Sequence, residues 1–212
     1  MAGVTVTVHL LRHGEVDNPG GVLYGRMAGF RLSELGQRQA EAAAKWLAER
    51  DIAYLVSSPL ERAQETAAAV AAQTGLEVAT DEGLIEAANY LEGRNVAGGK
   101  GLFTDLSNWK YFRNPFRPSW GEPYAQIAAR VLAAARTART HADGREAVCV
   151  SHQLPIVCAR RAANGQRLFH DPRRRKCELA SVTSLIFDGD AIVRVDYSEP
   201  AAALPRGKGA GA

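Results

Sequence analysis

Short apolar segments alternate with longer amphipathic ones along this chain, and that alternation restricts its possible folds more than any other feature. Strands are predicted at 5–11, 53–58, 76–80 and 146–151. Helices are predicted at 33–50, 59–74, 122–141 and 154–164. Two last strands, within 178–189 and 191–198, would form a hairpin turning at Asp188-Gly189. Strands separated by helices favour a three-layer α/β/α sandwich with a mainly parallel sheet.

One domain is expected to include residues 1–200 of the 212-residue chain, because a chain of this length can bury about 70% of its unfolded surface in one core. The helix and strand pattern weakens between 94 and 121, where a Gly-rich stretch precedes an aromatic one. We interpret this stretch as an insertion, or lid, beside a site. The small residues at 201–212 predict a disordered tail.

The composition argues against several classes of protein. Lys and Arg number 26 against 23 Asp and Glu, and a net charge of +3 does not favour nucleic-acid binding. We found no apolar run near the roughly 20 residues of a membrane span, and no signal peptide at the N-terminus. Three cysteines without metal-binding spacing predict reduced thiols in a cytoplasmic protein.

Polar side chains follow three of the predicted strands at the point where each strand ends. They are Arg12 and His13 in "LLRHGE", Ser57 and Arg62 in "VSSPLER", and Ser151 and His152 in "VCVSHQLP". Ligands of open α/β sheets bind outside the carboxyl ends of the strands. The sequence therefore predicts that these three clusters form one site.

The second cluster indicates what this site would bind. "SPLE" is typical of a helix start, with Ser58 as N-cap and Pro59 at the first helical position. Arg62 then lies in the first turn, where the helix dipole disfavours a cation by a few tenths of a kcal/mol. A bound anion would offset that cost. Two arginines and the helix amides suit a phosphate group.

The two histidines supply possible chemistry on such a phosphate. Imidazole has a pKa of about 6.5, so one neutral histidine could attack phosphorus while the other, protonated, stabilises charge on the oxygens. A leaving alkoxide would need a proton from a carboxylic acid. Glu82, Glu86 and Glu92 follow the third predicted strand, and the residues alone decide neither between these acids nor between the histidines.

These motifs resemble those of the histidine phosphatase superfamily, in its phosphoglycerate-mutase-like branch. "LRHGE", "SSPLERAQETA" and "VSHQLPI" match its three signature blocks in order, and the similarity extends from residue 5 to about 187. The resemblance implies a phosphoglycerate-mutase-like fold and a phosphohistidine intermediate, with a small phosphomonoester as substrate. It implies no metal and no cofactor.

The resemblance also implies a role for each site residue. His13 would be the nucleophile, Glu86 the proton donor, and Arg12, Arg62 and His152 the phosphate pocket. Asn18 would add a phosphate contact, one position nearer the histidine than is usual in the family. "LIEAANYLEG" replaces the Asn-Glu-Arg-His-Tyr-Gly of glycolytic mutases, which favours a metal-independent phosphatase. The alternatives are a phosphomutase and a phosphate-binding module without turnover.

Other polar residues receive a structural interpretation or are left open. His9, inside the first strand, is expected to be structural, and a metal site formed by His9, His13 and His152 is disfavoured. The basic run 173–176 is interpreted as a solvated loop, with binding of a polyanionic substrate as the alternative. The oligomeric state and the identity of the substrate do not follow from the sequence.

Overall fold

The fold was analysed in a computed structural model that describes residues 5–94 and 121–207. Its strands are β1 (Thr5–Arg12), β2 (Ile52–Ser57), β3 (Ala79–Thr80), β4 (Glu146–Ser151), β5 (Val182–Asp188) and β6 (Ala191–Ser198). Its helices are α1 (Glu34–Ala48), α2 (Glu61–Thr74), α4 (Tyr124–His141) and α5 (Gln153–Ala163), with 3-10 helices η1 (Glu82–Leu84) and η3 (Pro172–Arg174).

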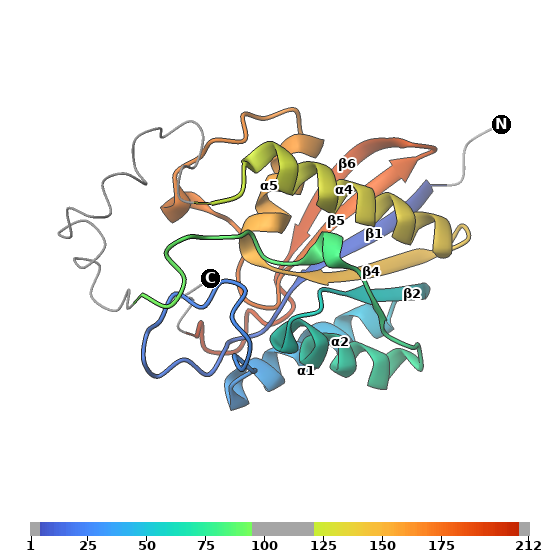
Figure 1. The fold of residues 1–212 in the computed structure, drawn as a ribbon. Helices are drawn as coiled ribbons and strands as arrows, with labels where there is room; N and C mark the ends of the chain where they lie inside the picture. Colours follow the sequence, from blue (N-terminus) through green and yellow to red (C-terminus); the bar gives the residue numbers. More distant parts are fainter. Residues whose placement is uncertain (1–4, 95–120, 208–212) are drawn as a thin grey trace.

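The strands form one six-stranded sheet in the order β3-β2-β4-β1-β5-β6. Strands β3, β2, β4 and β1 are parallel to one another, whereas β5 is antiparallel to β1 and β6 is antiparallel to β5. Helices α1 and α2 cover one face of the sheet, and α4 and α5 cover the other (Figure 1). The predicted three-layer sandwich with a mainly parallel sheet is confirmed.

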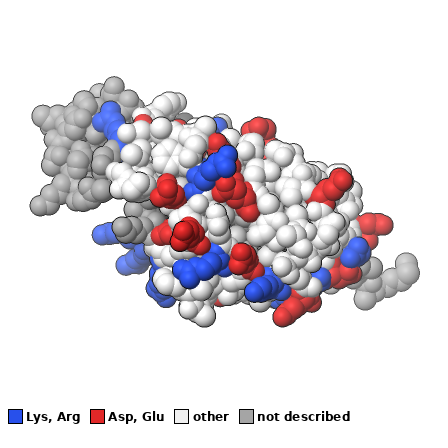
Figure 2. Space-filling view, turned by 90° about the horizontal axis from the view of Figure 1, so that it is seen from below, with Lys and Arg blue, Asp and Glu red and all other residues white. Residues whose placement is uncertain are grey.

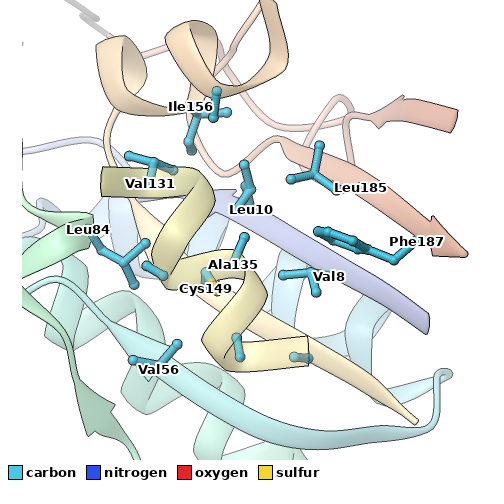
Figure 3. Packing of buried hydrophobic residues seen from close by; sticks show 14 of the residues in the cluster. Val8, Leu10, Val56, Leu84, Val131, Ala135, Cys149, Ile156, Leu185 and Phe187 are labelled. Carbon is cyan, nitrogen blue, oxygen red and sulfur yellow. The ribbon is translucent and has the colours of Figure 1, made fainter. Parts of the chain in front are cut away.

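The central strands are buried on both faces, because β4 and the second half of β1 have apolar side chains on both sides. Val8 and Leu10 of β1 pack with Phe187 against α4 and α5, as Figure 3 shows. Leu11 and Val148 belong instead to the cluster beneath α1 and α2. The core therefore holds the parallel strands rigidly and fixes the positions of their carboxyl ends.

Several boundaries differ from the predicted ones. Strand β3 is only two residues long, and the hairpin loop is Gly189-Asp190, one residue later than predicted. Helix α2 has Leu60 rather than Ser58 as its N-cap. The Ser58 hydroxyl lies instead within hydrogen-bond distance of His152, so a tertiary contact replaces the expected capping box.

The chain after β6 also packs on the domain. Ala201 and Leu204 contact the apolar cluster beneath α1 and α2, and the Gln39 side-chain amide donates to the Pro205 carbonyl at 3.2 Å. Residues 201–207 therefore differ from the disordered tail expected there, because two apolar side chains find a buried surface. Residues 208–212, and residues 95–120 of the expected insertion, lie outside the described residues.

Charges of both signs are interspersed over the outer face formed by α1 and α2 (Figure 2). Arg31, in the loop before α1, pairs with Glu65 of α2 at 3.6 Å. Within the described residues, no helix is both long enough and apolar enough to span a bilayer.

Candidate active site

Three parallel strands bring the predicted site residues together. Arg12 pairs with Ser151 in the β1–β4 register, and the amide of His13 donates to the Ser151 carbonyl at 3.1 Å. The amide of Ser58, just after β2, donates to the Val150 carbonyl at 2.9 Å. The carboxyl ends of β1, β4 and β2 are therefore adjacent, as the sequence predicted.

Two buried arginines, Arg12 and Arg62, lie at this edge of the sheet. Arg12 and Arg62 are 2% and 0% exposed, and within 5–94 and 121–207 neither forms a salt bridge. One nitrogen of each binds a backbone carbonyl: Arg12 donates to Cys177 and Arg62 to Gly25, both at 2.6 Å. Buried charges usually have a counter-charge, so this arrangement favours an anionic ligand.

The polar atoms without a partner also indicate an anion. Among the described residues, no hydrogen-bond partner exists for these buried atoms: Arg12 Nε and Nη2, Arg62 Nε and Nη1, His13 Nε2, His152 Nδ1 and Glu86 Oε2. Buried polar groups in proteins are nearly always hydrogen-bonded. The four guanidinium nitrogens can only donate, and planar guanidinium groups match the oxygens of phosphate.

The hydrogen bond of His13 determines which of its nitrogens can attack. Its Nδ1 lies 2.7 Å from the Gly14 carbonyl oxygen, which can only accept, so Nδ1 carries the proton. In the neutral ring the lone pair is then on Nε2, the atom without a partner. Burial, followed by the charges of Arg62 and Arg12, lowers the pKa of His13 well below 6.5. This histidine is therefore neutral at neutral pH and available as a nucleophile.

His152 lies beside His13, with 5.1 Å between the ring centroids. Its Nε2 is 2.8 Å from the Ser58 hydroxyl, which can donate to it and leave the proton of His152 on Nδ1. Burial lowers the pKa of His152 well below 6.5, and electrostatic interactions with Arg62 and His13 lower it further. A neutral His152 can thus present an N–H to a ligand, which differs from the protonated partner that the sequence suggested.

Of the three candidate acids, Glu86 alone is a buried carboxyl beside the arginines. It is 3% exposed, whereas Glu82 is exposed and Glu92 accepts a hydrogen bond from the Arg26 amide at 3.0 Å. Glu86 Oε1 accepts from the Ala87 amide at 2.8 Å, and Oε2 is without a partner among the described residues. Burial raises the pKa of Glu86, although Arg62 opposes this effect. A carboxyl with a raised pKa can serve as a general acid.

Two arginines that the sequence analysis missed hold the Glu86 segment in place. Arg130, on α4, donates to the carbonyls of Gly83 and Ile85 at 2.7 and 2.6 Å. Arg26 donates to the Glu86 carbonyl at 2.7 Å, and both arginines pair with Glu122. The sequence did hold one indication of this role for Arg130. The residue lies beside the apolar stripe of its helix, where a charged side chain needs a partner.

Two glycines allow the loop after β1 to approach α1. A Cβ on Gly14 would lie 2.3 Å from the Gly36 carbonyl oxygen, and one on Gly36 would lie 2.0 Å from the Glu15 carbonyl oxygen. Tyr24, which the sequence analysis also missed, is buried under Arg62, with 4.7 Å from the guanidinium carbon to the ring centroid. These close contacts fix the backbone of His13 and the side chain of Arg62.

Some predicted residues lie elsewhere or have other partners. The Asn18 side chain binds both backbone groups of Val22, at 2.8 and 3.1 Å, so its amide closes its own loop. His9 lies between Ser184 and Glu146 at 2.8 and 2.6 Å, which is a structural arrangement. The described residues contain no group of three or more His, Cys, Asp or Glu suited to a metal. Cys149, Cys158 and Cys177 are buried free thiols.

Comparison with known proteins agrees with this geometry. The family model of the histidine phosphatase superfamily (branch 1) matches residues 8–199. This chain belongs to the histidine phosphatase superfamily. It is 58% identical over 195 residues to the uncharacterized protein Rv0525 of Mycobacterium tuberculosis, a match that covers 92% of this chain and 96% of the relative.

Solved structures of superfamily phosphatases have the same fold. Mycobacterial glucosyl-3-phosphoglycerate phosphatase in complex with VO3 superposes with a TM-score of 0.69 at 26% identity, covering 95% of this chain and 99% of that one. An H9A mutant of phosphoserine phosphatase from Entamoeba histolytica superposes with a TM-score of 0.72 over 92% of this chain and 98% of that one. Its identity of 22% supports the fold alone.

Proposed function

We propose that this protein is a metal-independent phosphatase that hydrolyses a small phosphomonoester through a phosphohistidine at His13. The observation that carries the proposal is the His13 side chain, which presents an unprotonated Nε2, without a partner among the described residues, beside two buried guanidinium groups. Positioning and charge stabilisation dominate phosphoryl transfer. The fixed position of neutral His13 supplies the positioning, and the two guanidinium groups supply the charge stabilisation.

In the first step, Nε2 of His13 forms a bond to phosphorus while the bond from phosphorus to the ester oxygen breaks. Glu86, whose pKa is raised by burial, gives its proton to the departing alkoxide. In the second step, water attacks the phosphohistidine, the phosphorus–nitrogen bond breaks, and inorganic phosphate leaves. The Glu86 carboxylate accepts the proton of that water, so both steps balance with no further reactant.

Arg12, Arg62 and His152 would stabilise the equatorial oxygens during both steps. The four guanidinium nitrogens without a partner among the described residues, together with Nδ1 of His152, give N–H donors for the oxygens of a planar PO3 unit. These donors are held by core contacts before the substrate binds, so little reorganisation is needed at the transition state. In Asn18, Val22 occupies the amide oxygen and one N–H, so the second N–H is the group that would contact the phosphate.

The comparisons support a phosphatase or a mutase of this superfamily. Glucosyl-3-phosphoglycerate phosphatase is named for hydrolysis, and the segment around Glu86 lacks the residues of glycolytic mutases. Hydrolysis is therefore the proposed reaction, with transfer to a second hydroxyl as its competitor.

The test measures phosphate release from a panel of phosphomonoesters in EDTA, with wild type, His13→Ala and the control His141→Ala. His141 ends α4 and is exposed. We expect release by the wild type and the control, a loss of at least about 10³-fold in His13→Ala, and an acid-labile phosphoenzyme only where His13 is intact. Equal release by His13→Ala would refute the histidine mechanism. Transfer of labelled phosphate to an added alcohol with little free phosphate would identify a mutase.

A further inference from the structure

Arg175 differs from the other residues of the basic run 173–176. Arg173 is exposed and pairs with Asp171 at 2.9 Å, and Arg174 and Lys176 are exposed. Arg175 is half-buried, and its guanidinium turns inward toward Gln153, the residue after His152. One residue of the run is thus directed to the edge of the site, whereas the others face solvent.

Within the described residues, every group that hydrogen-bonds the Arg175 side chain is neutral. Nδ1 of His170 lies 2.6 Å from the Leu168 carbonyl oxygen and so carries the proton, which leaves His170 Nε2 to accept from Arg175 Nε at 3.0 Å. Gln153 Oε1 lies 3.5 Å from Arg175 Nη1, and the Tyr124 side chain also hydrogen-bonds Arg175. No carboxylate within 5–94 and 121–207 pairs with Arg175. The guanidinium is oriented, but its charge is not neutralised by these contacts.

The Arg175 guanidinium also lies near enough to Glu86, the proposed proton donor, for its charge to act on that carboxyl. Gln153 donates to the Cys177 carbonyl at 3.4 Å, and Arg12 donates to the same carbonyl, so Arg175 is linked to Arg12 through the Gln153 side chain and that carbonyl. Its charge opposes the rise in the pKa of Glu86 more strongly than that of Arg12 does. If Glu86 protonates the leaving oxygen, the alcohol portion of the substrate must extend past Glu86.

We propose that Arg175 binds a second anionic group, a carboxylate or a second phosphate, on the alcohol portion of the substrate. This inference rests on the proposed phosphatase function and narrows its substrate class to phosphomonoesters that carry another negative charge. Tyr124, His170 and Gln153 keep the guanidinium oriented before binding, which reduces the entropy lost when the anion docks.

The test uses three esters of equal chain length: propyl phosphate, 3-phosphonooxypropanoate and propane-1,3-diyl bisphosphate. Arg175→Gln removes the charge, and Arg174→Gln is the control on the exposed neighbour. In Arg175→Gln we expect kcat/KM to fall about 10- to 100-fold for the ester with a second anionic group that the wild type prefers, mainly through KM, since charge-assisted hydrogen bonds are the strong ones. The fall for propyl phosphate should be less than about threefold. The wild-type preference distinguishes carboxylate from phosphate.

Binding of the same esters to His13→Ala separates this inference from the proposed function. Calorimetric titration measures the binding of each ester, without turnover, to His13→Ala and to the double variant that carries both His13→Ala and Arg175→Gln. Weaker binding in the double variant of only the esters that carry a second anionic group would support the inference even if no ester were hydrolysed. An equal loss of binding affinity for all three esters, or no loss of affinity for any of them, would overturn the inference about Arg175. This holds whether or not the wild type is a phosphatase.

Discussion

At the scale of single residues, the site depends on opposite effects of one environment on two kinds of ionisable group. Burial disfavours the charged form of each group, so it lowers the pKa of His13 and raises that of Glu86. The proposed first step needs His13 neutral and Glu86 protonated at the same time. With ordinary pKa values this combination would be rare, because Glu86 would lose its proton at a lower pH than His13. The lowered pKa of His13 and the raised pKa of Glu86 allow the two required forms to exist at the same pH.

The pH dependence of kcat/KM should follow from these directions. Activity should fall on the acidic side as His13 gains a proton, at a pH below the usual imidazole range. It should fall on the alkaline side as Glu86 loses its proton, at a pH above the usual carboxyl range. Glu86→Gln should remove the alkaline limb and lower kcat/KM for propyl phosphate about 10²- to 10⁴-fold. It should affect p-nitrophenyl phosphate much less, because nitrophenolate leaves without a proton.

Steady-state rates of both esters across pH check this expectation, with Glu82→Gln as the matched control on an exposed glutamate of the same segment. An alkaline limb that persists in Glu86→Gln, or equal losses for the two esters, would show that Glu86 is not the general acid.

At the scale of elements, the position of Glu86 depends on a helix that follows it in the chain. The carbonyls of Gly83 and Ile85 accept hydrogen bonds from Arg130 of α4, and the Ser151 hydroxyl at the end of β4 donates to the Leu84 carbonyl at 2.6 Å. The segment has little regular structure of its own. Its conformation is therefore set by α4 and β4, which makes Arg130 a positioning residue.

Arg130→Met should move Glu86 without altering the nucleophile. We expect kcat for propyl phosphate to fall about 10-fold or more, since small misplacements of a catalytic group are costly, with little change in KM. The loss for p-nitrophenyl phosphate should be smaller, as for Glu86→Gln. Arg139→Met is the control, because Arg139 lies on the same helix and pairs with Asp190. If Arg130→Met lowers the melting temperature but slows both esters equally, its role is only structural.

At the scale of the whole molecule, the site carries a cost in stability. Arg12 and Arg62 are buried with no carboxylate paired to them among the described residues, and the polar atoms around them lack partners there. Burying charge without a counter-charge destabilises the folded state. The apolar clusters on both faces of the sheet must offset this cost, as is common where function and stability conflict.

Inorganic phosphate should therefore stabilise the fold. At 100 times its Kd, a ligand that binds only the folded state contributes about 2.7 kcal/mol, which raises the melting temperature of a chain of this size by roughly 5 to 10 °C. Arg62→Met should lose most of this shift, and its melting temperature without phosphate should equal or exceed that of the wild type. Calorimetric melting with phosphate, and with chloride at equal ionic strength, measures both effects. An equal response to the two salts would contradict binding at this site.

Much of the fold could be predicted from the sequence because hydrophobic periodicity is local. The alternation of strands and helices, the Ser33 cap of α1 and the end of α2 at Gly75 all agree with the structure. Errors occurred where a tertiary contact outweighed a local preference. Ser58 faces His152 instead of capping α2, and Leu204 packs on the core instead of ending in a free tail.

The sequence by itself determined the strand-end residues, because the carboxyl ends of adjacent parallel strands must meet wherever such a sheet forms. The residues alone left open which glutamate joins Arg12 and Arg62, and the resemblance to the superfamily indicated Glu86 before the structure placed it there. Only the tertiary structure decided which nitrogen of His13 is unprotonated and which residue of the basic run contacts Gln153 at the edge of the site. Each of these depends on burial and on contacts between residues far apart in the chain, such as Arg130 with the Glu86 segment. No local pattern encodes those contacts, since they exist only after the layers have packed.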